Sequence, residues 1–210
     1  MSVWSIPIAL LAFLAAGGSC PAGMLHQIAT IPVPGAPFET YDVGVVDHGR
    51  YYMADRSNKS VDIFDLKTNT FISRIAGFAG VGPHGSSDSG PNAITVVHNG
   101  KEIWGTDGDS SVKVIDLKKG AIVDSISTGG SRRTHAGDYD PKDEVFLVGN
   151  DSDDPPFLTF ISTKPGHKVL AKIPLPRATD GLETPVYDRA SGMFYVTCRS
   201  STRTRTKVGY

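Results

Sequence analysis

The sequence predicts an all-β protein of the propeller class, and three observations support that prediction. First, a polar loop followed by a short β-rich strand recurs at residues 55–65, 107–116 and 150–162. Second, Asp65 and Asp116 are 51 positions apart and Asp116 and Ser162 are 46 apart, near the ~45-residue period of a propeller blade. Third, no segment after the N-terminus keeps the 3.6-residue apolar period of a helix.

Each repeat is expected to hold four short antiparallel strands. The expected strands are 42–46, 50–54, 60–64 and 71–75 in the first unit, 93–97, 102–105, 111–115 and 121–126 in the second, and 136–139, 144–148, 157–161 and 168–173 in the third. Asn99-Gly100 and Lys119-Gly120 fall between apolar runs. Because Gly accepts a positive φ without a steric cost, these pairs indicate hairpin turns.

A fourth unit begins in the same way and then stops. Residues 187–196 match residues 139–148 at an offset of 48. Residues 197–210 then carry four basic residues, no acid and no apolar pattern. We interpret 197–210 as an aberrant basic tail produced by a shift of reading frame, since one choice of codons yields an acidic, turn-rich loop in another frame. The alternative is a genuine basic tail that binds polyanions.

The predicted blades cover 40–76, 91–127, 135–174 and 182–196, within an incomplete propeller at 24–196. Closed propellers have roughly 4–8 blades, and a repeat array without a cap exposes an apolar face and an open sheet edge. We therefore interpret the chain as one domain, a partial ring of three four-stranded blades and half of a fourth. The fragment is expected to be marginally stable or prone to aggregation.

Residues 1–23 are predicted to be a signal peptide. An apolar run at 6–16 precedes Gly17-Gly18-Ser19, which is typical of an export signal, although no Lys or Arg comes before it. The run is too short for a transmembrane span. The expected destination is the periplasm or the cell surface, and lipidation of Cys20 is the alternative to soluble export. Cys20 and Cys198 both lie outside the repeats, which excludes a disulfide framework there.

The charge balance gives no support for nucleic-acid binding. The net charge is −1, from 21 basic and 22 acidic residues. A protein that neutralises phosphates would carry a clear excess of Lys and Arg on one face. No nucleic-acid partner is therefore expected, and the partner is expected to be a protein or a small molecule.

Several phrases resemble the YVTN-type β-propeller repeats of bacterial exported proteins. They are residues 50–56, 61–65, 111–117 and 125–130, and the resemblance covers about residues 40 to 196. It rests on a strand, a polar Asp or Asn loop, a strand that ends in Ile-Asp, and a Thr-Gly turn. The resemblance implies a seven-bladed ring and an exported or cell-surface binding module. Some members of the group lie beside redox or haem proteins, and one branch is linked to DNA.

Four residues are candidates for a ligand site, because propeller ligands often lie where the innermost strands begin. In this register those positions hold Asn92, His135, Asp138 and Glu183. One oxygen or imidazole ligand from each blade could hold one divalent metal, Ca²⁺ or Mg²⁺. The structural alternative is that these groups cap strands or line a wet channel. The metal interpretation corresponds to a hydrolase or lyase of the lactonase-like propeller class.

Other polar features have simpler interpretations. The loops 107–109 and 150–154 offer oxygen ligands for Ca²⁺, but they lack the EF-hand pattern, and Asp, Asn and Gly also favour tight turns. His48, His84, His98 and His167 are interpreted as solvated turn residues, and 77–90 as a flexible surface loop. No nucleophile, P-loop or haem motif occurs. The leading hypothesis is a non-catalytic binding or scaffold module without a cofactor.

Overall fold

The computed structural model describes residues 27–199, which contain sixteen strands and no helix. Contacts divide the chain into residues 1–30 and residues 31–210, and every strand belongs to the second unit. Among the described residues of the first unit, Gln27 donates a side-chain hydrogen bond to Thr30 at 2.7 Å. The predicted signal peptide and most of the predicted tail lie outside the described residues. No helix in 27–199 could span a bilayer.

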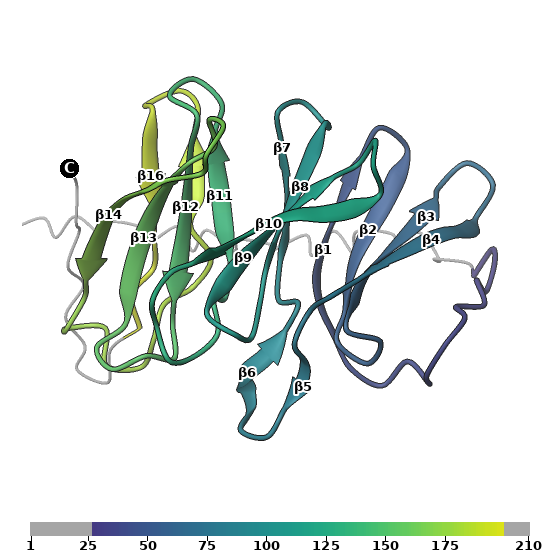
Figure 1. Cartoon of the computed structure of the whole chain (residues 1–210), viewed down its shortest axis with the longest axis horizontal. Helices are drawn as coiled ribbons and strands as arrows, with labels where there is room; N and C mark the ends of the chain where they lie inside the picture. The colour runs from purple at the N-terminus through teal and green to yellow at the C-terminus, as the bar shows by residue number, and fades with distance from the viewer. Residues whose placement is uncertain (1–26, 200–210) are drawn as a thin grey trace, which may run out of the picture. The chain divides into compact units, whose positions relative to one another are not determined.

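Three four-stranded antiparallel sheets form the body of the second unit (Figure 1). Within each sheet, strands that are consecutive in the sequence pair with one another. The sheets comprise β1 (Tyr41–Asp47), β2 (Arg50–Asp55), β3 (Ser60–Asp65) and β4 (Thr70–Ala76); β7 (Ile94–Val97), β8 (Glu102–Thr106), β9 (Ser111–Asp116) and β10 (Ala121–Ser127); and β11 (Gly137–Asp140), β12 (Val145–Asn150), β13 (Phe157–Ser162) and β14 (Val169–Pro174). The strands and turns expected from the repeat are thus confirmed, within one or two residues at each end.

The first strands of successive sheets contact one another: β1 contacts β7, β7 contacts β11, and β11 contacts β15 (Val186–Asp188). The N–H of Val43 donates to the carbonyl of Asn92 at 3.0 Å, next to a parallel bridge between Val43 and Ala93. Thr95 donates its hydroxyl to the carbonyl of Gly137 at 2.9 Å. The first strand of each sheet is therefore the edge at which the sheets meet.

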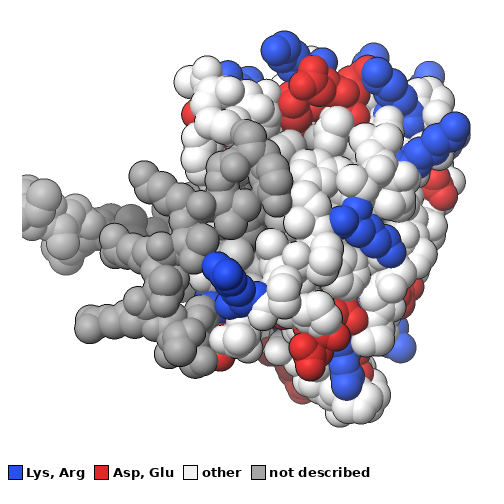
Figure 2. All heavy atoms as spheres, turned by 90° about the vertical axis from the view of Figure 1, so that its left-hand side faces the viewer, with Lys and Arg blue, Asp and Glu red and all other residues white. Residues whose placement is uncertain are grey.

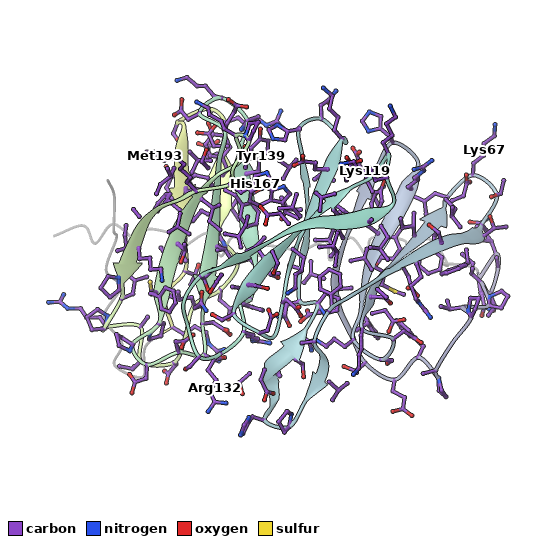
Figure 3. The ribbon with its side chains drawn as sticks, in the orientation of Figure 1. Lys67, Lys119, Arg132, Tyr139, His167 and Met193 are labelled. Carbon is purple, nitrogen blue, oxygen red and sulfur yellow. The ribbon has the colours of Figure 1, made fainter. Side chains whose placement is uncertain are left out.

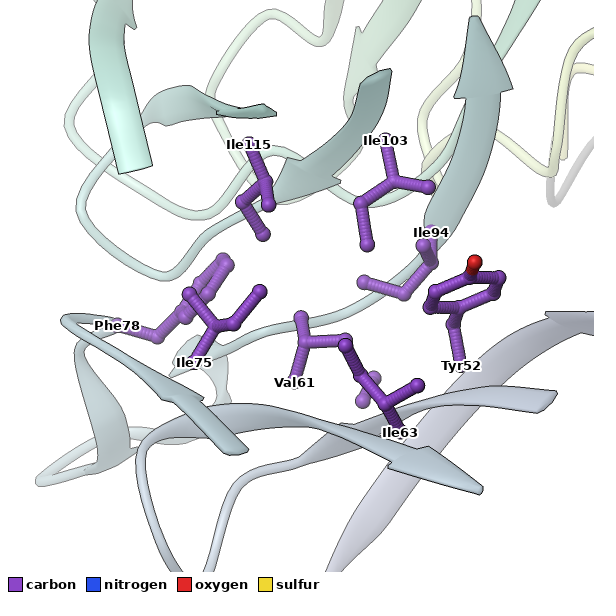
Figure 4. Packing of buried hydrophobic residues seen from close by; sticks show 9 residues of the cluster. Tyr52, Val61, Ile63, Ile75, Phe78, Ile94, Ile103 and Ile115 are labelled. Carbon is purple, nitrogen blue, oxygen red and sulfur yellow. The ribbon is translucent and has the colours of Figure 1, made fainter. Parts of the chain in front are cut away.

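Two apolar clusters hold the three sheets together. The cluster between the first two sheets combines residues of β2, β3 and β4 with residues of β7, β8 and β9, as Figure 4 shows. Its buried members are Tyr52, Ala54, Val61, Ile63, Ile75, Phe78, Ile94, Ile103 and Ile115. The cluster between the second and third sheets is built around Trp104, which is fully buried and lies 5.1 Å from the Phe146 ring. Each strand can contribute apolar side chains to both faces of its sheet, because successive side chains point to opposite sides.

The interpretation of 77–90 as a flexible loop is wrong, because this segment contains a hairpin. β5 (Gly80–Gly82) pairs with β6 (Gly85–Gly90), and the hairpin extends from the lower end of the sheets in Figure 1. The carboxylate of Asp88 accepts the backbone N–H of His84 at 3.0 Å, and Gly82 donates to the Ser89 hydroxyl at 3.0 Å. These side-chain bonds stabilise a hairpin that has almost no apolar residues to signal it.

The fourth sheet has two strands among the described residues, β15 and β16 (Met193–Tyr195). Their pairing continues past Val196, because Glu183 donates its N–H to Thr197 at 2.9 Å and Arg199 donates to Gly181 at 2.9 Å. An apolar cluster of Leu147, Leu158, Ala178 and Leu182 packs this hairpin against the third sheet. The fourth unit is thus joined to the third as the second is to the first.

Candidate functional site

Polar residues that precede the first strands of the second and third sheets lie close together at one end of these sheets. Asn92 precedes β7 and is fully buried. Its side-chain N–H donates to the carbonyl of Thr134 at 2.7 Å, and Thr134 immediately precedes His135. The structure therefore brings Asn92 and His135 to neighbouring positions at the starts of β7 and β11.

Two arginines complete this group, which we call the arginine cluster: Asp42, Arg56, Asn92, Arg133, His135 and Asp151. Arg56 follows β2 and donates through Nη2 to the carboxylate of Asp42 and to the amide oxygen of Asn92. Its Nε donates to the carbonyl of Pro91 at 3.3 Å. Asp42 belongs to β1, so the side chain of Arg56 links the first sheet to the start of the second.

Arg133 makes a two-bond ion pair with Asp151. Its Nε donates to one carboxylate oxygen at 3.1 Å and its Nη2 to the other at 2.6 Å. Arg133 lies in the connection between β10 and β11, and Asp151 follows β12. The side chains are 11% and 12% exposed, so water screens this pair only weakly.

The charges of the cluster influence one another. Burial lowers the pKa of the Arg56 guanidinium from its ordinary value, the charge of Asp42 opposes that change, and the positive charge of Arg133 adds to it. Burial opposes ionisation of Asp151, but the hydrogen bond and charge of Arg133 outweigh it and hold the pKa of Asp151 below its ordinary value. Two largely buried guanidinium groups, one after β2 and one in the connection between β10 and β11, are therefore within electrostatic reach of each other.

Three nitrogen positions of the cluster have no acceptor or donor among the described residues. They are Nη1 of Arg56, Nη1 of Arg133 and Nδ1 of His135. Nδ1 of His135 is buried, and its nearest carboxylate oxygen, on Asp151, is 3.8 Å away. A buried polar atom without a partner is uncommon in folded proteins. These positions could bond to a ligand with oxygen acceptors.

The β5–β6 hairpin forms a wall beside the cluster. The N–H of Arg133 donates to the carbonyl of Ser87 at 2.9 Å. Burial opposes ionisation of Asp88, but the hydrogen bonds and charge of His84, with a smaller contribution from the charge of Arg132, hold the pKa of Asp88 below its ordinary value. Figure 3 shows Arg132 at the lower end of the sheets, away from Lys67 and Lys119 on turns near the other end.

The other two candidate residues lie apart from the arginine cluster. Asp138 is on β11, where one carboxylate oxygen accepts the N–H of Tyr187 at 2.7 Å and the other accepts the N–H of Tyr139 at 2.8 Å. Glu183 is half exposed, and its carboxylate is 3.5 Å from Nη1 of Arg199. One oxygen of Asp138 thus joins β11 to β15 and the other is used within β11. No hydrogen bond or ion pair among the described residues joins Glu183 to Asn92 or His135.

The Asp-rich loops connect neighbouring sheets. Asp107, fully buried, accepts the N–H of Ala79 at 3.0 Å and that of Gly108 at 2.7 Å. Asp153 accepts the N–H of Ser131 at 2.7 Å. Within residues 27–199, no group of three or more His, Cys, Asp or Glu side chains is placed to hold a metal ion. These carboxylates bind backbone of the preceding unit in addition to forming local turns.

The histidines divide into two pairs. His48 and His84 are largely exposed, as expected. The expectation of solvation is wrong for the other two. His98 Nε2 is 2.9 Å from the carbonyl of Thr163, and His167 Nδ1 is 2.7 Å from a carboxylate oxygen of Asp124. Both contacts join the second and third sheets, so packing between the sheets leaves these two rings only partly exposed.

No family model matches the chain, and no curated protein is significantly similar to it. The fold and the site show an all-β protein of repeated sheets with a polar cluster where the sheets meet. Sequence patterns alone did not reveal Asp42, Arg56, Arg133 or Asp151 as members of that cluster. The available signal was an Arg placed beside the start or end of a predicted strand in two units.

Proposed function

We propose that this chain is a non-catalytic binding module of the β-propeller class, exported to the periplasm or cell surface, and that the arginine cluster binds its ligand. The ring architecture is supported by the four consecutive sheet units and by the contacts between their first strands. The order and spacing of those units agree with the resemblance to YVTN-type repeats. Seven blades and the export route rest on that resemblance and on residues 1–23.

One observation carries the binding proposal. Two nearly buried guanidinium groups, on Arg56 and Arg133, each keep Nη1 without an acceptor among the described residues, beside the unpaired Nδ1 of His135. Arg presents its donors in a planar fork that matches a carboxylate. A small carboxylate bound by both guanidinium groups would also reduce the repulsion between their charges. The proposed ligand class is therefore a small carboxylate.

The residues of the cluster suit binding better than catalysis. The amide of Asn92 is engaged by Arg56 and Thr134, and both carboxylates of the cluster are engaged by arginines. A metal-dependent hydrolase or lyase would need Asn92, His135 and Glu183 to converge on one ion, and Glu183 has no contact with the other two among the described residues. No contact in 27–199 favours that alternative.

The test uses succinate as the probe, with binding to the full chain measured by isothermal titration calorimetry. A neutral double variant, Arg133→Leu with Asp151→Leu, removes both members of one ion pair and so avoids leaving a buried charge. We expect succinate binding to weaken at least about tenfold in this variant, because charge-assisted hydrogen bonds are lost. Lys119→Gln, on an exposed turn, is the matched control and should bind as the wild type does. Equal binding by all three proteins would contradict the proposal.

A further inference from the structure

A hollow of about 260 Å³ lies between the first and second sheets, beside the β1–β2 turn and the β7–β8 turn. Its polar lining comes from five side chains, those of Asp47, His48, Arg50, Tyr52 and Asn99. Asp47 is the last residue of β1, whereas Asp42 of the arginine cluster lies near the start of that strand. The hollow and the arginine cluster are therefore at opposite ends of β1.

Tyr52 is the most buried of the five polar side chains, at 2% exposed. Its ring packs with Ile63 and Ile94 in the cluster between the two sheets, and Figure 4 shows its oxygen at the end of the ring away from Ile63. Within residues 27–199 the hydroxyl has no hydrogen-bond partner, yet protein atoms do not enclose it completely. A buried tyrosine hydroxyl usually has a partner, so this one is available to a molecule in the hollow.

The equivalent position in the second sheet has a partner within the protein. Arg50 and Glu102 each pair with the last residue of the third strand in their sheet, and Tyr52 and Trp104 follow two positions later. Trp104 donates its Nε1–H to the carboxylate of Glu102 at 3.0 Å. Among the described residues no such bond joins Tyr52 to Arg50. The first sheet thus lacks the internal hydrogen bond that the second sheet has.

The histidines that follow the first strands of these two sheets also differ. His98 reaches the next sheet, where its Nε2 is 2.9 Å from the carbonyl of Thr163, and its side chain is 24% exposed. His48 is 2.7 Å from its own neighbour, Asp47, and is 69% exposed. The residue that matches Thr163 in the second sheet is Leu117, which lines the hollow. A histidine therefore bridges the second interface, whereas the first interface keeps the hollow.

The free polar groups of the hollow define the chemistry of its ligand. Arg50, Tyr52 and Asn99 make no side-chain hydrogen bond within residues 27–199, and His48 uses only one oxygen of Asp47. Arg50 only donates, the other oxygen of Asp47 only accepts, and Tyr52 and Asn99 do both. Asp47 would repel an anion, and Arg50 would repel a cation. A neutral ligand with several hydroxyls, each a donor and an acceptor, matches this set.

The charge pattern on the face shown in Figure 2 gives no support for a large anionic partner. On that face, Lys and Arg side chains of the described residues lie near Asp and Glu, around a mostly uncharged centre. A nucleic acid would need a continuous basic face. A small neutral ligand has no such requirement.

We propose that the hollow binds a neutral monosaccharide through neighbouring hydroxyl groups. Arg50 donates to ligand oxygens, Asp47 accepts from a ligand hydroxyl, and Tyr52 bonds to the ligand at the most buried part of the hollow. Leu117 provides an apolar wall for the C–H face of the sugar ring. A volume of about 260 Å³ is close to the lower limit for small-molecule sites and suits a single sugar ring. This site is independent of the arginine cluster and of its ligand.

The test titrates the full chain separately with D-glucose, D-galactose, D-mannose and N-acetyl-D-glucosamine and follows binding by NMR. We expect at least one sugar to bind saturably at millimolar concentration. Tyr52→Phe removes only the unpartnered hydroxyl and should weaken binding about three- to tenfold. Tyr51→Phe is the matched control, because it removes the same atom from the adjacent residue of β2, whose side chain points to the opposite face. The control should bind as the wild type does.

Two further variants complete the test. Asn99→Gly should also weaken sugar binding, and it keeps the turn intact because Asn99 has a φ of 55°, which Gly adopts without strain. This variant carries the test if Tyr52→Phe does not fold. The double variant Arg133→Leu with Asp151→Leu should bind the sugar as the wild type does, which separates this site from the arginine cluster.

Three results would overturn the proposal. The first is no binding of any of the four sugars at millimolar concentration. The second is an unchanged affinity in both Tyr52→Phe and Asn99→Gly. The third is binding of inorganic phosphate in place of the sugars, which would assign the hollow to an oxyanion.

Discussion

Asp107 accepts the backbone N–H of Ala79 with both carboxylate oxygens, at 3.0 and 3.2 Å. Ala79 lies in the segment that leaves the first sheet, and Asp107 follows β8 of the second. A single buried carboxylate thus fixes the path of the chain between two sheets. Asp153 has the same role in the following unit, where it accepts the N–H of Ser131. The polar loops of the repeat are therefore structural connections between units.

Replacing Asp107 should change the pH dependence of stability. Burial, assisted by the charge of Asp109, raises the pKa of Asp107 to about 6, and the bonds from Ala79 and Gly108 and the charge of Lys113 oppose this. The folded state then holds the proton more tightly than the unfolded state does. This contribution to the free energy of unfolding is present below pH ~4 and is lost as pH rises to ~6.

Asp107→Asn should remove that loss. Between pH 4 and pH 7, the wild type should lose up to about 3 kcal/mol more unfolding free energy than the variant does. Urea unfolding at several pH values would measure the difference. Parallel pH profiles for the two proteins would show that the buried carboxyl does not titrate in this range.

Asp124→Ala should change the free energy of unfolding with the opposite pH dependence and by a smaller amount. The hydrogen bond from His167 holds the pKa of Asp124 below its ordinary value of 3.8, against a smaller effect of burial. The Asp124 side chain is 43% exposed, so solvent screening limits the loss at pH 7 to about 1 kcal/mol or less. Because the folded-state pKa is depressed, this stabilisation is present above pH ~4 and disappears below it.

Thermal unfolding of wild type and Asp124→Ala at pH 7 and pH 3 would test this. The two proteins should differ at pH 7 and converge at pH 3. A difference that stays constant across this range would assign the effect to packing and not to the hydrogen bond with His167.

Asn92→Ala should destabilise the fold by about 2–3 kcal/mol. The substitution leaves the carbonyl of Thr134 and a donor of Arg56 without their partner in a buried place, and unsatisfied buried groups are costly. Urea unfolding at pH 7 measures this effect. Lys101→Ala, on an exposed turn, is the control and should change stability by less than about 0.5 kcal/mol. Similar values for both variants would mean that the amide of Asn92 contributes nothing to stability.

Two glycines of the third sheet provide a matched pair. A Cβ on Gly137 would lie 2.3 Å from the Phe146 ring and 2.7 Å from the carbonyl of Leu147, whereas a Cβ on Gly149 meets nothing closer than 3.6 Å. Gly137→Ala should therefore cost at least about 2 kcal/mol through overpacking. Gly149→Ala should be nearly neutral or stabilising by up to about 1 kcal/mol, because Ala restricts the unfolded chain.

Thermal unfolding of both variants would test this pair under identical conditions. The expected order of stability is Gly149→Ala at or above wild type and Gly137→Ala well below it. The reverse order would show that the ring of Phe146 can move away from β11 without cost.

The amino-acid sequence by itself determined the strands and their order within each sheet. Alternation of apolar and polar residues, with Gly at the turns, is local information, and it placed all twelve strands of the three complete sheets. It failed for β5 and β6, because Gly-Ser-Ser-Asp carries no apolar period, and their bonds run through the side chains of Asp88 and Ser89. Asn92 and His135 could also be predicted from the sequence as site residues, since both precede a predicted first strand.

Tertiary structure alone decided which polar groups meet. Arg56 and Arg133 come from different repeats, and the pairs that hold them, with Asp42 and Asp151, are separated by 14 and 18 residues. No local pattern predicts such pairs, because they depend on how one sheet stacks on the next. The contact between His167 and Asp124 also could not be predicted from a local pattern, because it forms only when the third sheet packs against the second. Short-range periodicity specifies strands, whereas the contacts of a site depend on the rotation and offset between sheets.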